Sequence, residues 1–159
     1  MSVLSRGALT GPSPVDRGRP GSKHHLIVDA HGIPLLAQLT AANRNDVTQL
    51  LALVDGITPV AGKRGRPRQR PDRVIADRGY DSDKHRRELW ARGIKPIIAR
   101  RKTEHGSGLG RWRWVVERTF SWLHQFRRLL IRWDRDPIIH IAFLTLGCAA
   151  ICWRQLNTF

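Results

Sequence analysis

The sequence contains few cysteines and few acidic residues, and both shortages exclude functions. Cys148 and Cys152 stand four positions apart in an apolar stretch, which matches neither a disulfide framework nor a C-x-x-C metal half-site. We expect both to be reduced core thiols. Only 13 Asp and Glu oppose 28 Lys and Arg, for a formal net charge of +15. This surplus predicts a polyanionic partner, with nucleic acid first and an anionic membrane surface second.

A long apolar run is also absent. The longest, at 138–153, is interrupted by His140, Thr145 and Gly147, and it is short against the about 20 residues of a membrane helix. We interpret it as a buried helix. The first 22 residues contain no apolar h-region typical of a signal peptide. We therefore expect a cytoplasmic protein without a membrane partner.

The basic residues are concentrated in the middle of the chain. Positions 61–135 hold 22 of the Lys and Arg residues but only 8 of the Asp and Glu residues. A confined basic field is what a nucleic-acid-binding surface requires. The densest part, 62–73, is rich in Arg and Pro and predicts an exposed basic loop. Its Arg-Gly-Arg-Pro at 64–67 also occurs at 17–20.

The remaining pattern predicts a mixed α/β domain at 23–156, after a flexible lead-in at 1–22 that is rich in Gly and Pro. Apolar runs at 26–28 and 33–39 predict a hairpin, with Gly32 taking the positive φ of its turn. We expect Asp46 to cap the next helix. A short strand then ends at Asp77, and Asp81, Ser82 and Asp83 offer caps to a helix that Gly93 stops. A strand at 95–101 and a flexible loop at 103–110 follow.

One long helix is predicted at 111–133, with the apolar helix packed on it. Its apolar positions recur every three or four residues and are expected in the core: Val116, Phe120, Leu123, Phe126, Leu130 and Trp133. A polar stripe runs beside them: Arg113, Glu117, Ser121, His124 and Arg128. Glu117 either ligates a hard cation or pairs with Arg113 as a solvated bridge, and the spacing favours the bridge.

Asp77 follows a buried strand at the edge where α/β folds place functional groups. The alternative is a carboxylate that caps the next turn. Phosphoryl transfer on DNA uses two divalent metals roughly 3.5–4 Å apart, held by carboxylates beside a basic surface. Together with Glu117 and the basic loop, Asp77 suits that chemistry.

Two segments carry a family resemblance: VIADRGYD at 74–81 and RWRWVVERTF at 111–120. In combination they resemble the DDE transposases of bacterial insertion sequences, in the group of families four and five. The resemblance runs from Gly18 to about Leu156. It implies an RNase H-like mixed sheet flanked by helices, and an Asp-Asp-Glu triad that binds two Mg²⁺. Asp77 matches the second Asp and Glu117 matches the Glu, while Arg113 matches the Arg that precedes the Glu.

The sequence departs from the family pattern at three places. Gly110 stands where the family has a Tyr, and His124 stands where it has a Lys. Arg127 or Arg128 would then supply the missing cation, and His124 would contact a phosphate. No strand carries the first Asp, because Asp16 lies among Gly and Pro. Asp29 falls in the hairpin turn and is interpreted as structural. We expect a catalytic domain that is incomplete on its N-terminal side and inactive alone, either as the second frame of a split element or as a remnant.

The resemblance implies double-stranded DNA as the partner, at element ends and target, with nucleoid association. The upstream reading-frame product and a second copy are further expected partners. Backbone contacts are assigned to the basic loop: Lys63, Arg64, Arg66, Arg68 and Arg70. Its KRGRPR also resembles an AT-hook core, which lies in the A·T minor groove, against the alternative of a solvated linker.

Trp112 and Trp114 either stack on exposed bases or belong to the core, and we expect at least one in the core. Two other functions compete with an enzyme fragment. One is a non-catalytic DNA-binding regulator of transposition, and the other is a basic ribosome-associated protein.

Overall fold

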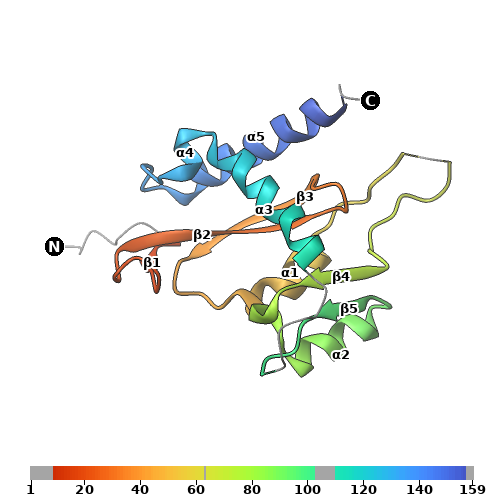
Figure 1. Ribbon diagram of the computed structural model, residues 1–159. Helices are drawn as coiled ribbons and strands as arrows, with labels where there is room; N and C mark the ends of the chain where they lie inside the picture. Colours follow the sequence, from red (N-terminus) through yellow and green to blue (C-terminus); the bar gives the residue numbers. More distant parts are fainter. Residues whose placement is uncertain (1–8, 63, 103–109, 157–159) are drawn as a thin grey trace.

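The computed structural model describes residues 9–62, 64–102 and 110–156. Strands and helices alternate along the chain as a mixed α/β fold (Figure 1). In chain order the elements are β1 (Gly11–Pro12), β2 (Pro20–Val28), β3 (Pro34–Ala41), η1 (Asp46–Gln49), α1 (Leu50–Asp55), β4 (Arg73–Ala76), η2 (Arg78–Tyr80), α2 (Asp83–Ala91), β5 (Lys95–Ile98), α3 (Gly110–His124), α4 (Arg127–Leu130) and α5 (Pro137–Leu156). Strand β1 and the start of β2 thus lie within the expected lead-in.

The strands form two separate sheets. Strands β1, β2 and β3 are antiparallel neighbours, and β2 pairs with β3 from Ser22–Ala41 to Val28–Pro34. Strands β4 and β5 are parallel and are joined through α2, as a parallel pair requires. Among the described strands, β4 pairs on one edge only, and β2 pairs with β1 only at Pro20 and Gly21.

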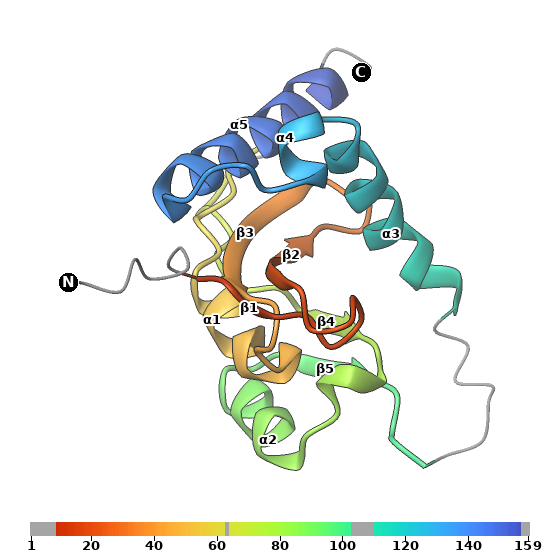
Figure 2. The ribbon, with the colours of Figure 1, turned by 90° about the vertical axis from the view of Figure 1, so that its left-hand side faces the viewer.

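The β2–β3 hairpin separates two hydrophobic cores, because neighbouring residues of a strand point to opposite faces. Ile27 packs on a core that includes Val74 and Leu89, whereas Leu26 packs on a core that includes Leu123 and Leu144. Figures 1 and 2 show α4 and α5 on one side of the hairpin, and α2 with the β4–β5 sheet on the other. The cores' buried members are Leu50, Val54, Val74, Leu89, Ile94 and Ile98 in the first, and Leu123, Leu129, Leu144 and Ile151 in the second.

The predicted hairpin is confirmed, together with the roles of its turn residues. Gly32 has a φ of 82°, and Asp29 accepts hydrogen bonds from the backbone N–H groups of His31 and Ile33. The buried Thr119 hydroxyl donates to the carbonyl oxygen of Gly32 at 2.7 Å. This bond ties α3 to the hairpin turn.

The long helix predicted at 111–133 is wrong, because the chain breaks after His124. Phe126 is extended and α4 begins at Arg127. The break shifts the core position by one residue, so that Leu129 is buried whereas Leu130 and Trp133 are exposed. In α3, Leu123 is buried as predicted, whereas Val115 and Thr119 are buried in place of Val116 and Phe120, which are half-buried. The loop expected at 103–110 lies, except for Gly110, outside the described residues.

The prediction that α5 is a buried helix is only half right. Its residues at 140, 144, 147 and 151 are buried, but most of its other apolar side chains are exposed. By length and composition alone, α5 is the one helix of the described residues that is apolar enough to cross a membrane. Of its most apolar 18-residue stretch, 22% is buried. Cys148 and Cys152 are free and half-buried, and burial raises the pKa of Cys148 to about 11.

Candidate active site

Asp77 stands directly after β4 and is exposed to solvent. Its Oδ1 accepts a hydrogen bond from the backbone N–H of Gly79 at 2.8 Å, so the carboxylate caps the η2 turn. The alternative prediction, that Asp77 caps the next turn, is therefore confirmed for Oδ1. Oδ2 takes no part in this bond, so the carboxylate keeps acceptor capacity on that oxygen.

Glu117 lies in the middle of α3 with its side chain 59% exposed. Its Oε1 accepts a hydrogen bond from the guanidinium of Arg113 at 2.9 Å, one helical turn earlier. The favoured i,i+4 bridge is thus present. An exposed pair of this kind contributes only about 0.3–0.5 kcal/mol to stability, so it leaves Glu117 available to a ligand that binds more strongly.

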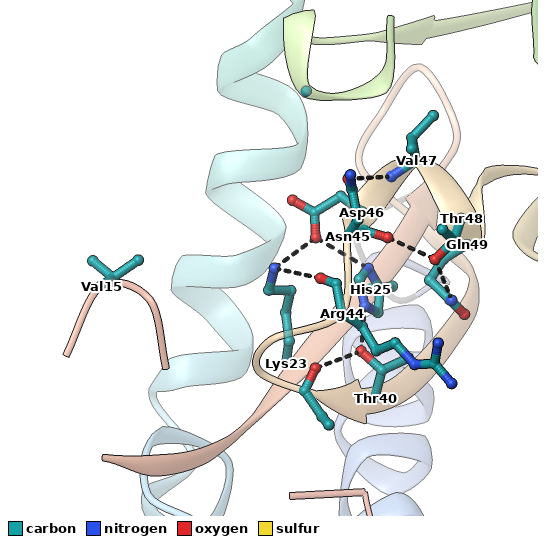
Figure 3. A network of polar contacts seen from close by, with 12 residues as sticks. Val15, Lys23, His25, Thr40, Arg44, Asn45, Asp46, Val47, Thr48 and Gln49 are labelled. Atoms are coloured by element: carbon teal, nitrogen blue, oxygen red, sulfur yellow. Dashed lines mark hydrogen bonds and ion pairs between the residues drawn. The ribbon is translucent and has the colours of Figure 1, made fainter. Parts of the chain in front are cut away.

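Asp46 is a third acid that the sequence pattern missed. It was expected to cap a helix, but the side chain that caps η1 is Asn45, which accepts from the N–H of Val47. Asp46 instead accepts a hydrogen bond from Nζ of Lys23 at 2.8 Å, as Figure 3 shows. Element η1 packs against η2, next to Asp77.

The neighbourhood of Asp46 connects it electrostatically to Asp77. Burial, and then the charges of Asp46 and Asp77, raise the pKa of Tyr80 to about 12. Both carboxylates therefore act on the same phenol. Lys23 and His25 lie on the same face of β2, because residues two apart in a strand share a face. Both side chains lie near Asp46.

His25 completes this network from the interior. It is buried, its Nε2 lies 2.7 Å from the Thr40 hydroxyl and its Nδ1 lies 3.8 Å from Asp46 (Figure 3). The Thr40 hydroxyl also lies 3.2 Å from the carbonyl oxygen of Ala41. Burial lowers the pKa of His25, against the opposing charge of Asp46.

Asp81 does not cap α2. Its carboxylate accepts from the guanidinium of Arg86 at 2.8 Å and from the backbone N–H of Arg101, and that N–H is the main cause that lowers the pKa of Asp81. Ser82 occupies the predicted N-cap position, but its hydroxyl lies 2.9 Å from Nδ1 of His85 and makes no capping bond to the helix backbone, and Asp83 pairs with Arg100. The prediction of a side-chain cap here is wrong, because Asp81 binds Arg86 and Arg101 and Asp83 pairs with Arg100.

The basic loop at 62–73 is exposed as predicted, apart from the half-buried Pro71. Arg64, Arg66 and Arg70 are all solvent-exposed, whereas Lys63 lies outside the described residues. Arg68 is engaged by both carboxylate oxygens of Asp72, at 3.0 and 3.2 Å. Within the described residues, the loop therefore presents a strongly cationic edge beside β4.

The described residues do not assemble a metal site of three or more His, Cys, Asp or Glu side chains. Helix α3, which carries Glu117, packs against β2, α4 and α5. Asp77 lies between β4 and η2. The hydrogen bonds described above therefore define the surroundings of Asp77 and of Glu117 one by one.

Comparison with known proteins assigns the family. The model of the transposase DDE domain matches residues 8–153. The chain belongs to the DDE transposase family. It is 66% identical over 148 residues to a Burkholderia cepacia protein named as a transposase for insertion sequence element IS402, covering 93% of this chain and 70% of that protein. No solved structure was found to match.

Two other relatives agree with this family. A Brucella ovis protein named as a transposase for insertion sequence element IS6501 is 29% identical over 140 residues, covering 84% of this chain and 98% of the relative. The transposase for insertion sequence element IS1106 of Neisseria meningitidis is 28% identical over 115 residues, covering 66% of this chain and 36% of the relative. The resemblance drawn from the two motifs is confirmed.

In this DDE transposase domain, the cations predicted after Glu117 lie at the last residue of α3 and in α4. His124 is exposed and stands beside the Phe120 ring, and Arg127 is exposed in α4. Arg128 lies over the Phe143 ring at 4.8 Å and 3.4 Å from Asp134. These contacts hold Arg128 against α5 and leave its position fixed.

The tryptophans at the start of α3 differ from expectation. Trp112 is 40% exposed and Trp114 is 50% exposed, so the expectation that one of them is a core residue is wrong. The guanidinium of Arg118 lies between Trp114 and Trp122, at 4.4 and 4.8 Å from the ring centroids. The first turns of α3 therefore carry a cation and aromatic rings on one surface.

Proposed function

We propose that this chain supplies part of the catalytic domain of an insertion-sequence transposase, with Asp77 and Glu117 as Mg²⁺ ligands for hydrolysis and strand transfer on DNA. The observation that supports this most directly is the position of Asp77. It is an exposed carboxylate at the carboxyl end of β4, in a chain of the DDE transposase family. That edge is where α/β folds collect reacting groups.

The chemistry of the two carboxylates fits Mg²⁺, which takes oxygen ligands and retains several waters. Both are exposed, and each has an oxygen outside the hydrogen bonds described above. Mg²⁺ bound to them would stabilise the charge that develops on the scissile phosphate. Two carboxylates do not complete a two-metal site.

The other residues of the proposed site bind and orient DNA. Arg113 holds the Glu117 carboxylate by a hydrogen bond, and it would exchange part of that contact for a phosphate oxygen. Backbone phosphates would be bound by the cations of the loop and of the α3–α4 junction: Lys63, Arg64, Arg66, Arg68, Arg70, His124, Arg127 and Arg128. Neutralising phosphates with these cations predicts strongly salt-dependent binding.

The third carboxylate is proposed to come from outside residues 9–156, on a strand added to an RNase H-like sheet. The free edges of β2 and β4 among the described strands support this, because an unpaired strand edge readily accepts another strand. Ile27 of β2 packs in the same core as Val74 of β4, so the two edges border one hydrophobic core. A preceding segment or the upstream reading-frame product would supply the strand, and a cytoplasmic, nucleoid-bound protein follows from the DNA partner.

A catalytically inactive DNA-binding regulator is the second candidate. The observation that favours it is that the described residues hold no three-member metal group, while Glu117 is already paired with Arg113. Such a protein would occupy element ends through the same cationic surface. Both functions require salt-sensitive DNA binding, and they differ in what Asp77 and Glu117 are needed for.

The test uses a duplex that carries the ends of the element. We expect the purified chain to bind it in low salt without nicking it in Mg²⁺. A fusion to the part of the IS402 relative that this chain does not match is expected to nick it, and Asp77→Asn or Glu117→Gln should abolish the nicking. Asp83→Asn is the control, since Asp83 pairs with Arg100 on the surface of α2.

Three results contradict parts of this proposal. Nicking by the unfused chain that disappears with Asp77→Asn shows that no third carboxylate is missing. Nicking by the fusion that survives Asp77→Asn removes the assigned catalytic role. A fusion that binds the ends but never nicks them favours the regulator.

A further inference from the structure

Helix α5 is apolar around its whole circumference. Its buried face is formed by His140, Leu144, Gly147 and Ile151, which pack toward β3, α3 and α4. A soluble helix normally carries polar residues on the opposite face. In α5 the opposite face is apolar as well, and only Arg154 carries a full charge among its 20 residues. One side of this helix is therefore explained by the fold of the chain, and the other is not.

The exposed apolar residues form a regular stripe opposite the buried face. They follow one another at intervals of three, four, three, four and three residues: Ile139, Ala142, Leu146, Ala149, Trp153 and Leu156. This alternation of three and four is the spacing of a coiled-coil seam. Figures 1 and 2 show α5 at the outer edge of the molecule, with no other element on this side.

The sizes along the stripe are self-complementary. If two α5 helices pack antiparallel about a two-fold axis midway between positions 146 and 149, Leu146 faces Ala149 of the second copy. Trp153 then faces Ala142, and Ile139 faces Leu156. Each of the two alanines thus lies opposite a large side chain, which is how facing layers interdigitate without voids. A two-fold interface requires this reciprocity, since one patch must complement itself.

Charge limits where a second copy can approach. The chain carries a net +15, so two copies repel each other wherever their basic surfaces meet. The stripe is the region where this repulsion is smallest, since none of its six residues is charged. It lies on α5, whereas the basic loop joins α1 to β4.

The area is sufficient for a specific contact. A Trp side chain covers about 150–250 Å² and the aliphatic residues somewhat less. At the exposed fractions of the stripe residues, this gives roughly 500 Å² per copy and about 1,000 Å² in total, at the lower limit of a specific interface. From the stripe's spacing, sizes and lack of charge, we propose that two copies of this chain dimerise by antiparallel packing of their α5 helices.

The test measures mass first. Sedimentation equilibrium of the nucleic-acid-free chain, in about 0.5 M NaCl to screen the basic surfaces, should show a reversible dimer of the 18.1 kDa chain. Leu146→Glu and Trp153→Glu should each shift the equilibrium to monomer by at least tenfold, since each buries two charges per dimer. Trp90→Glu is the matched control, because Trp90 is a 57% exposed tryptophan on α2. Circular dichroism of every variant shows whether it folds.

The register is tested by disulfide formation between copies, in a chain with Cys148→Ser and Cys152→Ser. An equimolar mixture of Leu146→Cys and Ala149→Cys chains should cross-link more efficiently than either chain alone. Efficient cross-linking of the Leu146→Cys chain with itself would indicate a parallel seam and overturn the antiparallel arrangement.

The remaining outcomes identify other occupants of the stripe. Flotation with phosphatidylcholine vesicles, which carry no net charge, separates apolar membrane binding from attraction of the basic surface. A monomer that floats with these vesicles and loses this property with Leu146→Glu would replace the dimer by a membrane contact. A chain that stays monomeric at all concentrations and does not float would also refute the proposal. Neither result bears on DNA binding or nicking, so the proposed function is tested independently.

Discussion

At the scale of single residues, the contact between Gly32 and Thr119 shows how one turn positions the helix that carries Glu117. Gly32 has a positive φ, and a Cβ added there would lie 2.9 Å from Oγ1 of Thr119. We expect Gly32→Ala to lower the free energy of unfolding by about 2–3 kcal/mol, from backbone strain and from displacement of Thr119. Urea denaturation followed by circular dichroism measures this.

Gly93→Ala is the control for Gly32→Ala. Gly93 also has a positive φ, at 73°, but a Cβ there would meet no atom within 4 Å. Its cost should be the left-handed backbone strain alone, about 1 kcal/mol. Equal destabilisation by the two substitutions would show that the contact with Thr119 does not matter.

A second residue-scale prediction concerns the pair of His24 on β2 and His140 on α5. Their Nε2 atoms lie 2.8 Å apart and their rings are stacked. Burial, and then the charges of His140, His124 and His25, lower the pKa of His24 to about 4. Burial also lowers the pKa of His140, aided by the charge of Arg132 and opposed by that of Asp134.

The sign of the pH dependence follows from these shifts. The unfolded chain binds protons at His24 near pH 6.5, whereas the folded chain does not until about pH 4, so stability is lost as the pH falls below 6.5. We expect a loss of about 2 kcal/mol between pH 6.5 and 5 in urea denaturation. His24→Gln should reduce this loss. If the variant and the unmodified chain lose the same amount, His24 is not the group that titrates.

At the scale of elements, the basic loop at 62–73 allows a prediction with an internal control. Arg64 and Arg66 are exposed in an Arg-Gly-Arg-Pro segment, and Arg17 and Arg19 are exposed in the second copy of the same four residues. Arg17 to Arg19 of the second copy lie within the turn between β1 and β2, which is closed by the bond from the N–H of Ser13 to the carbonyl of Arg19.

We expect Arg64→Ala with Arg66→Ala to reduce the slope of log K against log salt by about two, because each arginine neutralises one phosphate. Any preference for A·T-rich duplexes should disappear as well, since the extended segment would insert its arginines in the narrow minor groove. Fluorescence anisotropy at several salt concentrations measures both. Arg17→Ala with Arg19→Ala should change neither the slope nor the A·T preference. An equal effect of both pairs would show that the loop binds DNA only as a general cationic surface.

The elements also show which parts of the fold could be predicted from the sequence. Local patterns were sufficient for the β2–β3 hairpin and for the strand that ends before Asp77, because turn residues and short apolar runs determine them. They were not sufficient for the break after His124. Leu129 and Leu130 are equally apolar, and only the packing of Leu123 and Leu129 around Gly147 decides which one is buried. The second apolar face of α5 was missed for the same reason, since periodicity does not show whether a partner exists.

At the scale of the whole molecule, only those features of the site that depend on a motif or on helical spacing could be predicted from the sequence. Asp77, Glu117 and Arg113 came from the two motifs, and the bond between Arg113 and Glu117 followed from their spacing. The contact of Lys23 with Asp46 joins residues 23 positions apart, and the raised pKa of Tyr80 connects that pair to Asp77. Such contacts depend on how η1 and η2 pack, which no local pattern contains.

The most direct test of the central claim is whether Asp77 and Glu117 hold the same metal ion. Mn²⁺ suits the same carboxylate and water ligands as Mg²⁺, and electron paramagnetic resonance of free Mn²⁺ measures its binding to the chain on a duplex. We predict that Asp77→Asn and Glu117→Gln each weaken binding by at least about tenfold, and that the double variant loses no more than the weaker single variant. Additive losses, unchanged binding in Glu117→Gln, or no bound Mn²⁺ in the unmodified complex would contradict the account.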